Sequence, residues 1–320
     1  MDEVCAVKHV ETMGNSITGL DDFALDFPVW VELWLVGTLF AMMFAVALAL
    51  VPGSFGFFQR SPRIYLAGLF SQLLALPAIT LLLCYLLQPS PTLALGMIIV
   101  ACCPGGASSN LVALYARGNI GLSVALTATS SILAAFLTPI STVFWSRLYG
   151  PTAEIMRALD LDVVAFLVQT ALILGVPIAA GMALCRFAPD WSLKWRGRVG
   201  LAAGLSLLGV IVVTTVMYFD AFWALGLGVP LLVWIHNFSA LGTGYGIGKA
   251  VRADDASVRS LTIETGIQNT GLALVIIVTQ FTGLGGAVAV VGLYGTYHLI
   301  SGLGIAWLWR RRKLPEPAPA

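Results

Sequence analysis

Apolar runs of about 20 residues recur along most of this chain, and each is long enough to cross the hydrocarbon core of a bilayer as a helix. The composition agrees, because 58% of the 320 residues are hydrophobic and 10% are charged. A soluble domain carries about 25% charged residues, so this chain needs lipid around it. The prediction is an all-α integral membrane protein with nine transmembrane helices, near 28–51, 64–87, 92–116, 119–144, 163–185, 199–218, 222–248, 257–282 and 286–309.

Several functions are disfavoured by what the sequence lacks. The formal net charge is +1, and no basic patch interleaved with aromatic residues indicates a nucleic-acid partner. The five cysteines form no CxxC motif or His/Cys cluster, which argues against a disulfide framework and a zinc site. No GxSxG, HExxH or pair of aspartates across two spans is present, so we expect no enzyme. Nothing in the sequence indicates an oligomeric state.

The basic residues predict the orientation in the membrane. One set of loops contains only Lys8, Arg147 and Arg157. The alternate set is expected to be cytoplasmic and contains Arg60, Arg63, Arg117, Arg186, Lys194, Arg196, Arg198, Lys249, Arg252, Arg259, Arg310, Arg311, Arg312 and Lys313. This places the N-terminus outside and the C-terminus inside a plasma or inner membrane. Residues 1–27 are acidic and lack the basic start of a signal peptide, so we expect an extracytoplasmic tail; residues 310–320 are expected to be a cytoplasmic tail.

Two of the predicted spans are interrupted in similar ways. The span at 92–116 contains Pro104 followed by Gly105 and Gly106, which weaken a helix. Its "ASSNLVAL" (107–114) aligns with "IQNTGLAL" in the span at 257–282. The two spans enter from opposite sides, so the alignment is a faint inverted repeat. Interrupted helices at matching places in inverted halves mark the binding site of secondary transporters.

Glu264 is the acidic residue placed well inside an apolar run. A charged carboxylate at that depth costs a few kcal/mol, so it needs a proton, a base or a metal cation. The intramembrane bases are His236 and His298. The alternative is a purely structural role, in which a protonated glutamate is hydrogen-bonded to a neighbouring helix. Unwound backbone near Gly266 is expected to offer carbonyl oxygens to a cation.

Other oxygen-bearing side chains accompany Glu264. Ser109 and Asn110 follow the Pro-Gly-Gly break, Ser123 and Thr127 lie four residues apart on one helix face, and Gln72 is a lone intramembrane amide. Hard cations take such oxygen ligands. The alternative is that these serines and threonines only form hydrogen bonds between neighbouring helices, which is common in membranes. The adjacent Cys102 and Cys103 are weak indicators of soft-metalloid chemistry and more often only pack.

Four stretches carry a resemblance to a known family. They are "ACCPGGASSNLVALYARGNIGLSVALTATSSILAAFLTP" (101–139), "LTIETGIQNTGLAL" (261–274), the pattern Gly68, Gln72 and Pro77, and "WIHNFSALGTGYGIG" (234–248). Over roughly residues 30–312 the chain resembles the bile acid:sodium symporter family in its nine-span form. The resemblance implies a core domain with two crossing discontinuous helices, packed against a panel domain. The panel would contain residues 28–63 and most of 163–248. The core would contain 64–144 and 249–309, together with the last span of 163–248, which is the first core helix of the second repeat.

The same resemblance implies a set of site residues. One sodium site would use Ser109, Asn110, Ser123, Thr127 and Glu264. A second would use Gln72, Glu264 and Gln268 with backbone oxygens of Thr265 and Ile267. Substrate would lie near Ser108, Asn269, Thr270 and His298. Two positions depart from the family pattern: Ala107 stands where threonine is frequent, and Leu299 stands where asparagine often follows the equivalent of His298.

The expected function is sodium-coupled symport of an organic anion by alternating access, with two sodium ions. The cargo classes are bile acid-like molecules, steroid conjugates, pantoate and 2-oxo acids. The alternatives are a proton-coupled or arsenite-type efflux carrier of related architecture, a membrane sensor that binds ligand without transport, and, more remotely, a thiol oxidoreductase built on Cys102 and Cys103.

Overall fold

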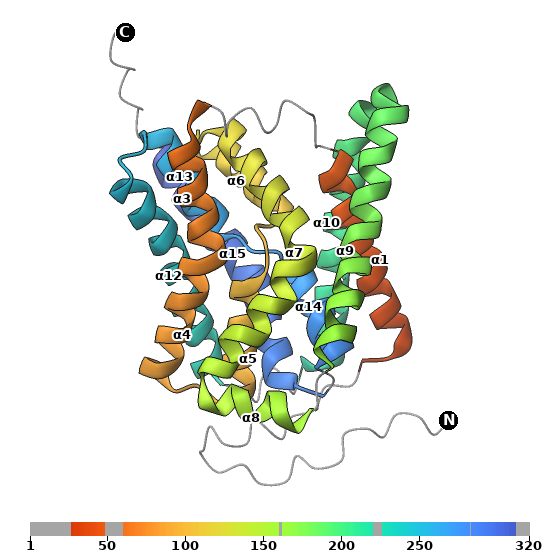
Figure 1. Ribbon diagram of the computed structural model, residues 1–320, viewed down its shortest axis with the longest axis vertical. Coiled ribbons are helices and arrows are strands. Elements are labelled where there is room, and N and C mark those ends of the chain that lie inside the picture. Colours follow the sequence, from red (N-terminus) through yellow and green to blue (C-terminus); the bar gives the residue numbers. More distant parts are fainter. Residues whose placement is uncertain (1–26, 49–59, 160–161, 220–225, 282, 312–320) are drawn as a thin grey trace.

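The computed structural model describes residues 27–48, 60–159, 162–219, 226–281 and 283–311. Within these ranges the chain is helical and contains no strand (Figure 1). The elements are α1 (Val29–Leu48), α3 (Pro62–Phe70), the π-helical η3 (Ser71–Ala75), α4 (Leu76–Leu87), α5 (Pro91–Cys102), α6 (Ala107–Tyr115), α7 (Ile120–Leu148), α8 (Gly150–Ala158), α9 (Val163–Phe187), α10 (Pro189–Met217), α12 (Gly228–Ala250), α13 (Asp255–Gly266), α14 (Thr270–Gln280) and α15 (Gly285–Arg311).

Six helices of the described chain are long and apolar enough to span a membrane. They are α1, the continuous Pro62–Leu87 segment, α7, α9, α10 and α15. The shorter α5 and α14 are also apolar. An all-helical membrane protein is therefore what the described residues form. The predicted tails at 1–27 and 310–320 fall largely outside the described residues, and so do the ends of three predicted spans, at 49–51, 222–225 and 282.

The structure differs from the predicted spans at two places, one a boundary and one a short additional helix. The span expected at 199–218 begins ten positions earlier, at Pro189, so the basic residues near 194–198 lie within α10 rather than in a loop. Proline at the first turn starts a helix well, and hydropathy alone does not detect a helix that extends beyond its apolar part. The short α8 was not predicted; it buries Thr152 and Met156 and packs on α5 and α7.

The π-helical turn in the second span has a local cause. Pro77 has no N–H for the helical bond to the carbonyl four residues before it, and the wider π turn Ser71–Ala75 lies directly ahead of it. Ser71 and Gln72 are both buried in this turn. Single π turns inside α-helices occur often at functional sites.

The helices form two packed groups. α1 packs extensively on α9 and α10, and these three helices lie together on one side of Figure 1. On the other side α12 packs on α13, and α15 packs on α5. α7 and α14 meet both groups, through α9 and α1 respectively. The interface between the groups therefore runs beside the broken helix α13–α14.

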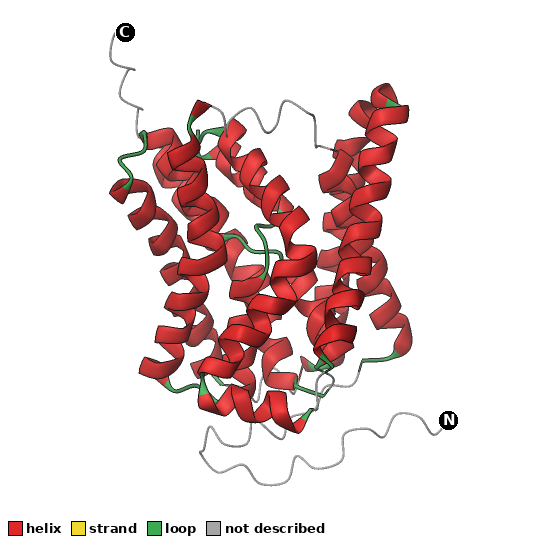
Figure 2. Ribbon diagram, viewed as in Figure 1, coloured by secondary structure: helices red, strands yellow, loops and turns green. Residues whose placement is uncertain are grey.

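The two interrupted helices cross at their breaks. The chain leaves helical geometry between α5 and α6 and again between α13 and α14, and these loops lie side by side in the centre of Figure 2. Gly105 pairs with Gln268 in an antiparallel bridge. The Gly106 N–H donates to the Ile267 carbonyl at 3.0 Å, and the Asn269 N–H donates to the Pro104 carbonyl at 2.8 Å. These bonds satisfy backbone groups that the breaks leave without helical partners.

Candidate functional site

Glu264 lies at the crossing, in the last turn of α13, and is fully buried. Its Oε1 accepts hydrogen bonds from Ser109 Oγ at 2.6 Å and from Ser123 Oγ, and its Oε2 accepts one from Thr127 Oγ1 at 2.8 Å. Ser109 comes from α6, just after the Pro-Gly-Gly break, whereas Ser123 and Thr127 share one face of α7. Residues separated by about 140 positions in sequence thus meet at one carboxylate.

The cluster contains more close oxygen–oxygen contacts than hydroxyl protons. Asn110 Oδ1 lies 2.9 Å from Ser123 Oγ and 3.5 Å from Thr127 Oγ1. The Ser109 and Thr127 hydroxyl oxygens are 3.4 Å apart. The three hydroxyls have one proton each to donate, whereas six close contacts join them to one another, to the carboxylate and to the Asn110 oxygen, so three of these contacts bring two oxygens together without a proton between them. An excess of close oxygens is the environment that a hard cation prefers.

A second group of polar atoms surrounds the end of α13. Gln72 Nε2 donates to the Glu264 carbonyl at 3.0 Å, and Gln268 Nε2 donates to the Thr265 carbonyl at 2.7 Å. Both amides are buried, and the Oε1 atoms of Gln72 and Gln268 have no hydrogen-bond partner. A buried acceptor without a partner is costly, so these two oxygens are available to a ligand. The Ile267 carbonyl, by contrast, already accepts from Gly106.

Glu264 makes no ion pair within the described residues. The ion pair found there joins Lys249 and Asp255 at the end of α12, at 3.0 Å. The buried base His236 is bonded through Nε2 to Thr80 Oγ1 at 2.8 Å, and Thr80 donates to its own helix at Leu76. Neither His236 nor His298 forms an ion pair with Glu264 in this part of the chain, which leaves a proton or a cation to compensate the carboxylate.

The residues expected near substrate do not form one contact cluster. Asn269 accepts from the Leu272 N–H at 3.0 Å as the cap of α14, and its Nδ2 lies 3.9 Å from Met43 Sδ of α1. His298 is buried in α15 and packs edge-on against the Tyr294 ring. Thr270 is buried and Ser108 is half-buried. No hydrogen bond joins His298 to Ser108, Asn269 or Thr270 among the described residues.

The amino-acid sequence of this chain is similar to that of known proteins. The model of the "Sodium Bile acid symporter family" matches residues 36–224, which is more than half of the chain. The chain belongs to the Sodium Bile acid symporter family. The resemblance inferred from the motifs is therefore confirmed, and the protein is a member of a family of sodium-dependent membrane transporters.

Individual relatives agree with this membership. The protein is 25% identical over 317 residues to "Uncharacterized sodium-dependent transporter YocS" from Bacillus subtilis (strain 168), covering 98% of this chain and 95% of the relative. It is 30% identical over 316 residues to "Probable sodium/metabolite cotransporter BASS1, chloroplastic" from Oryza sativa subsp. japonica, covering 90% and 73%. It is 26% identical over 193 residues to "Ileal sodium/bile acid cotransporter" from Cricetulus griseus, covering 60% and 53%. These relatives are transporters, which agrees with the expectation of no enzyme.

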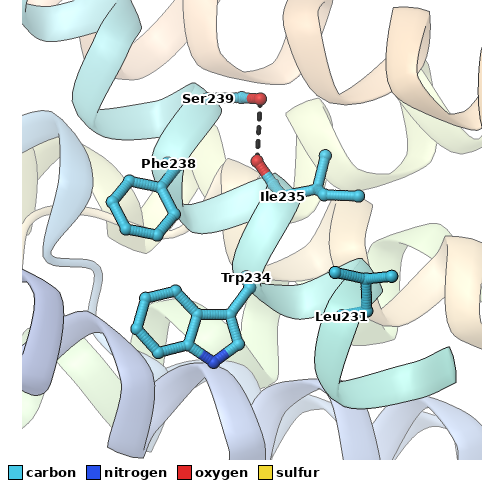
Figure 3. A pocket seen from close by; sticks show the side chains of 5 residues that line it. All are labelled: Leu231, Trp234, Ile235, Phe238 and Ser239. Atoms are coloured by element: carbon cyan, nitrogen blue, oxygen red, sulfur yellow. Dashed lines mark hydrogen bonds between the residues drawn. The ribbon is translucent and has the colours of Figure 1, made fainter. Parts of the chain in front are cut away.

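This family member also has a surface groove of about 580 Å³ on α12. It is lined by Leu231, Trp234, Ile235, Phe238 and Ser239, and Figure 3 shows the Ser239 hydroxyl turned to the Ile235 carbonyl of the same helix, at 2.8 Å. The hydroxyl that lines the groove is bonded within α12, and the groove contains no residue of the Glu264 cluster. It is therefore separate from the candidate ion site.

Sequence reasoning missed four polar residues around the crossing. Ser71 Oγ lies 2.7 Å from Thr265 Oγ1. Asn237, Tyr294 and Ser301 form a buried chain of hydrogen bonds that reaches the Gly266 carbonyl. Asn237 lay within a family-like motif, which was the available signal. Tyr294 and Ser301 gave none, because hydroxyls in apolar runs are common.

Proposed function

We propose that this protein is a sodium-coupled symporter that imports an organic anion. The observation that carries the proposal is the buried Glu264 carboxylate, which lies among oxygen ligands and has no basic partner in the described chain. Family membership supports coupling to sodium. A cation bound there would offset the buried negative charge, which otherwise costs a few kcal/mol.

The first sodium site is proposed to lie inside the hydroxyl cluster. Its ligands would be the side-chain oxygens of Ser109, Asn110, Ser123, Thr127 and Glu264. Each of the five lies within hydrogen-bonding distance of at least two of the others. When sodium binds, the hydroxyl protons can turn outward and their oxygens can face the ion.

The second sodium site is proposed on the opposite side of the Glu264 turn. The unpartnered Oε1 atoms of Gln72 and Gln268 support it, together with backbone oxygens at Thr265 and Ile267. The Ile267 carbonyl would keep its bond from Gly106 and offer its second lone pair. Two ions sharing Glu264 give a reason for the π turn, because that turn places Gln72 next to the α13 end.

We propose that transport proceeds by motion between the two packed groups. The panel would contain α1, α9 and α10, and the core would contain the remaining helices around the crossing. Counting each broken pair as one span, together with α12, brings the six long apolar helices to nine spans. The crossing pairs would be inverted repeats, with the N-terminus outside and the C-terminus cytoplasmic.

The cargo is proposed to bind beside Asn269, where the crossing faces the panel. Asn269 sits one residue before α14, whose N-terminal dipole favours an anion. Thr270, Ser108 and His298 would complete the pocket after the panel moves away. Bile acids, steroid conjugates, pantoate and 2-oxo acids are the candidate classes. Two sodium ions with one monovalent anion carry net positive charge inward, so a membrane potential contributes about 2.3 kcal/mol per 100 mV.

Proteoliposome uptake tests this function. The full chain is reconstituted, and uptake of labelled taurocholate, oestrone sulfate, pantoate and pyruvate is measured with sodium or choline outside. We expect one of these anions to enter only with sodium, and faster with an inside-negative potassium diffusion potential. Uptake that is equal in choline and follows a pH gradient would instead favour the proton-coupled alternative. Sodium-stabilised binding with no flux of any anion would favour the sensor.

The arsenite-type alternative requires that the thiols of Cys102 and Cys103 take part in transport. Cys102 and Cys103 are free and buried, with exposed fractions of 5% and 1%. They precede the Pro-Gly-Gly break, and within the described residues no hydrogen bond links either thiol to the Glu264 cluster. Arsenite flux that is lost in a C102S/C103S double variant would support this alternative. Unchanged anion uptake in that variant supports the sodium symporter.

A further inference from the structure

The carbonyl groups at the end of α13 are held by side chains rather than by the next helical turn. A helix leaves its last four carbonyls without intrahelical donors. Those of Glu264 and Thr265 accept from Gln72 and Gln268, as described above. The carbonyl of Gly266 accepts from Asn237 Nδ2 at 2.9 Å and from Tyr294 Oη at 3.1 Å.

The donors to Gly266 differ chemically from the two glutamines. Asn237 Oδ1 accepts from Ser301 Oγ, so both ends of this amide are satisfied. The Oε1 atoms of Gln72 and Gln268 have no partner. Asn237 is thus fully engaged in holding backbone, whereas each glutamine holds backbone with its nitrogen and presents a free oxygen.

The clamp on Gly266 joins three helices. Asn237 belongs to α12, whereas Tyr294 and Ser301 belong to α15, and all three side chains are buried. The contact with α12 is close, because a Cβ on Gly266 would lie 2.3 Å from Leu241 Cδ2. Two donors on a single carbonyl leave the peptide that follows it little freedom to rotate. That peptide leads into Ile267 and Gln268 at the crossing.

We propose that Asn237, Tyr294 and Ser301 are positioning residues that set the sodium affinity of this protein by holding the Gly266 carbonyl. The inference rests on the proposed sodium sites and adds residues that touch no ion. Loss of one donor leaves the carbonyl partly satisfied and allows the end of α13 to rotate. The backbone oxygens of Thr265 and Ile267, which flank Gly266, then shift away from their positions.

The test measures sodium binding by the full chain in detergent. Thermal unfolding is followed while sodium chloride replaces choline chloride at constant ionic strength, and the sodium concentration for the half-maximal shift is determined. For Tyr294→Phe we expect that concentration to rise by about tenfold, the usual effect of one lost buried hydrogen bond. The maximal shift at saturating sodium and the melting temperature in choline should change little.

Tyr297→Phe is the matched control. Tyr297 lies three residues further along α15, and its ring packs on Trp234 at 5.1 Å, away from the crossing. It loses the same hydroxyl, and its half-maximal sodium concentration should equal that of the wild type. Equal shifts in both tyrosine variants would overturn the proposal, since the effect would then not pass through Gly266.

Ser301→Ala keeps the proposal testable if Tyr294→Phe does not fold. It removes the donor to Asn237 Oδ1 and should raise the half-maximal sodium concentration in the same direction, by about threefold. A wild-type sodium response in both Tyr294→Phe and Ser301→Ala would reject the positioning role but would leave the proposed sodium symport unaffected. If the wild-type protein itself shows no sodium-dependent shift, the proposed sodium symport fails instead.

Discussion

At the scale of single residues, the most consequential feature is the free-energy cost of burying the charge of Glu264. Glu264 is fully buried, and its hydrogen-bonding partners Ser109, Ser123 and Thr127 are neutral. Neutral donors reduce the cost of burying a carboxylate but do not cancel its charge. A cation that enters this cluster therefore stabilises the folded protein, and its binding free energy adds to the free energy of unfolding.

Replacement of Glu264 by glutamine should abolish the sodium response. The amide keeps the size of the side chain but removes the charge that attracts the ion. We expect the sodium-induced rise in melting temperature and the sodium-dependent uptake to disappear in Glu264→Gln, while the melting temperature in choline is equal to or above the wild type. Glu32→Gln, in the first turn of α1, is the control and should keep the full response. A normal sodium response in Glu264→Gln would remove this residue from the proposed sites.

Gln72 distinguishes the two proposed ions. Its Oε1 has no partner, and its amide nitrogen donates to the Glu264 carbonyl rather than to a hydroxyl of the first cluster. We expect Gln72→Leu to reduce the steepness of uptake against sodium concentration and to lower sodium affinity by about tenfold, the effect of losing one ligand. Ser123→Ala should act on the other ion. Additive losses in the double variant would indicate two sites, whereas a double variant no worse than either single one would indicate a single site.

At the scale of elements, the two broken helices can cross closely because Gly105 and Gly106 have no side chain at the crossing. A Cβ on Gly105 would lie 2.9 Å from Glu264 Oε2 and 3.0 Å from Gln72 Nε2. On Gly106 it would lie 2.9 Å from the Gln268 carbonyl. The break between α5 and α6 is thus shaped to receive the Glu264 carboxylate and the Gln268 carbonyl of the other broken helix, together with the Gln72 amide of η3.

Gly105→Ala should therefore damage the site without unfolding the protein. The added methyl group displaces the Glu264 carboxylate and the Gln72 amide, and overpacking of this kind costs about 1–3 kcal/mol. We expect at least a tenfold loss of sodium affinity together with a lower melting temperature. Gly242→Ala in α12 meets no atom within 4 Å and is the matched control. Equal behaviour of the two alanine variants would show that the space at Gly105 is not needed.

At the scale of the whole molecule, the proposed motion requires the α1–α9–α10 group to separate from the crossing. A Cβ on Gly271, in α14, would lie 3.5 Å from Met42 Sδ of α1 and 3.7 Å from Leu207 Cδ1 of α10. The start of α14 is therefore packed directly on the other group. In the proposed mechanism, substrate reaches Asn269 only after this contact opens.

A cross-link across that contact should stop transport. In a background with the native cysteines replaced, Met42→Cys and Gly271→Cys are joined by a short bis-methanethiosulfonate reagent. We expect uptake to stop and to return after reduction with dithiothreitol. The control pair is Ala45→Cys with Gly200→Cys, both within the α1–α10 pair, where a Cβ on Gly200 would lie 3.8 Å from the Ala45 Cβ. Continued uptake with Met42→Cys and Gly271→Cys fully joined would contradict a motion between the two groups.

The sequence by itself determined the properties that depend on neighbouring residues. The apolar runs predicted a lipid environment and helices that span it. Pro104 and the two glycines after it predicted one helix break, and the spacing of Ser123 and Thr127 predicted that both lie on one face of α7. Tertiary structure decided what depends on distant segments meeting. It paired Gly105 with Gln268 and bound Gly266 to Tyr294, and it left the oxygens of the two glutamines unpartnered. Hydropathy and periodicity are local, whereas a hydrogen-bond partner that another helix supplies exists only after packing.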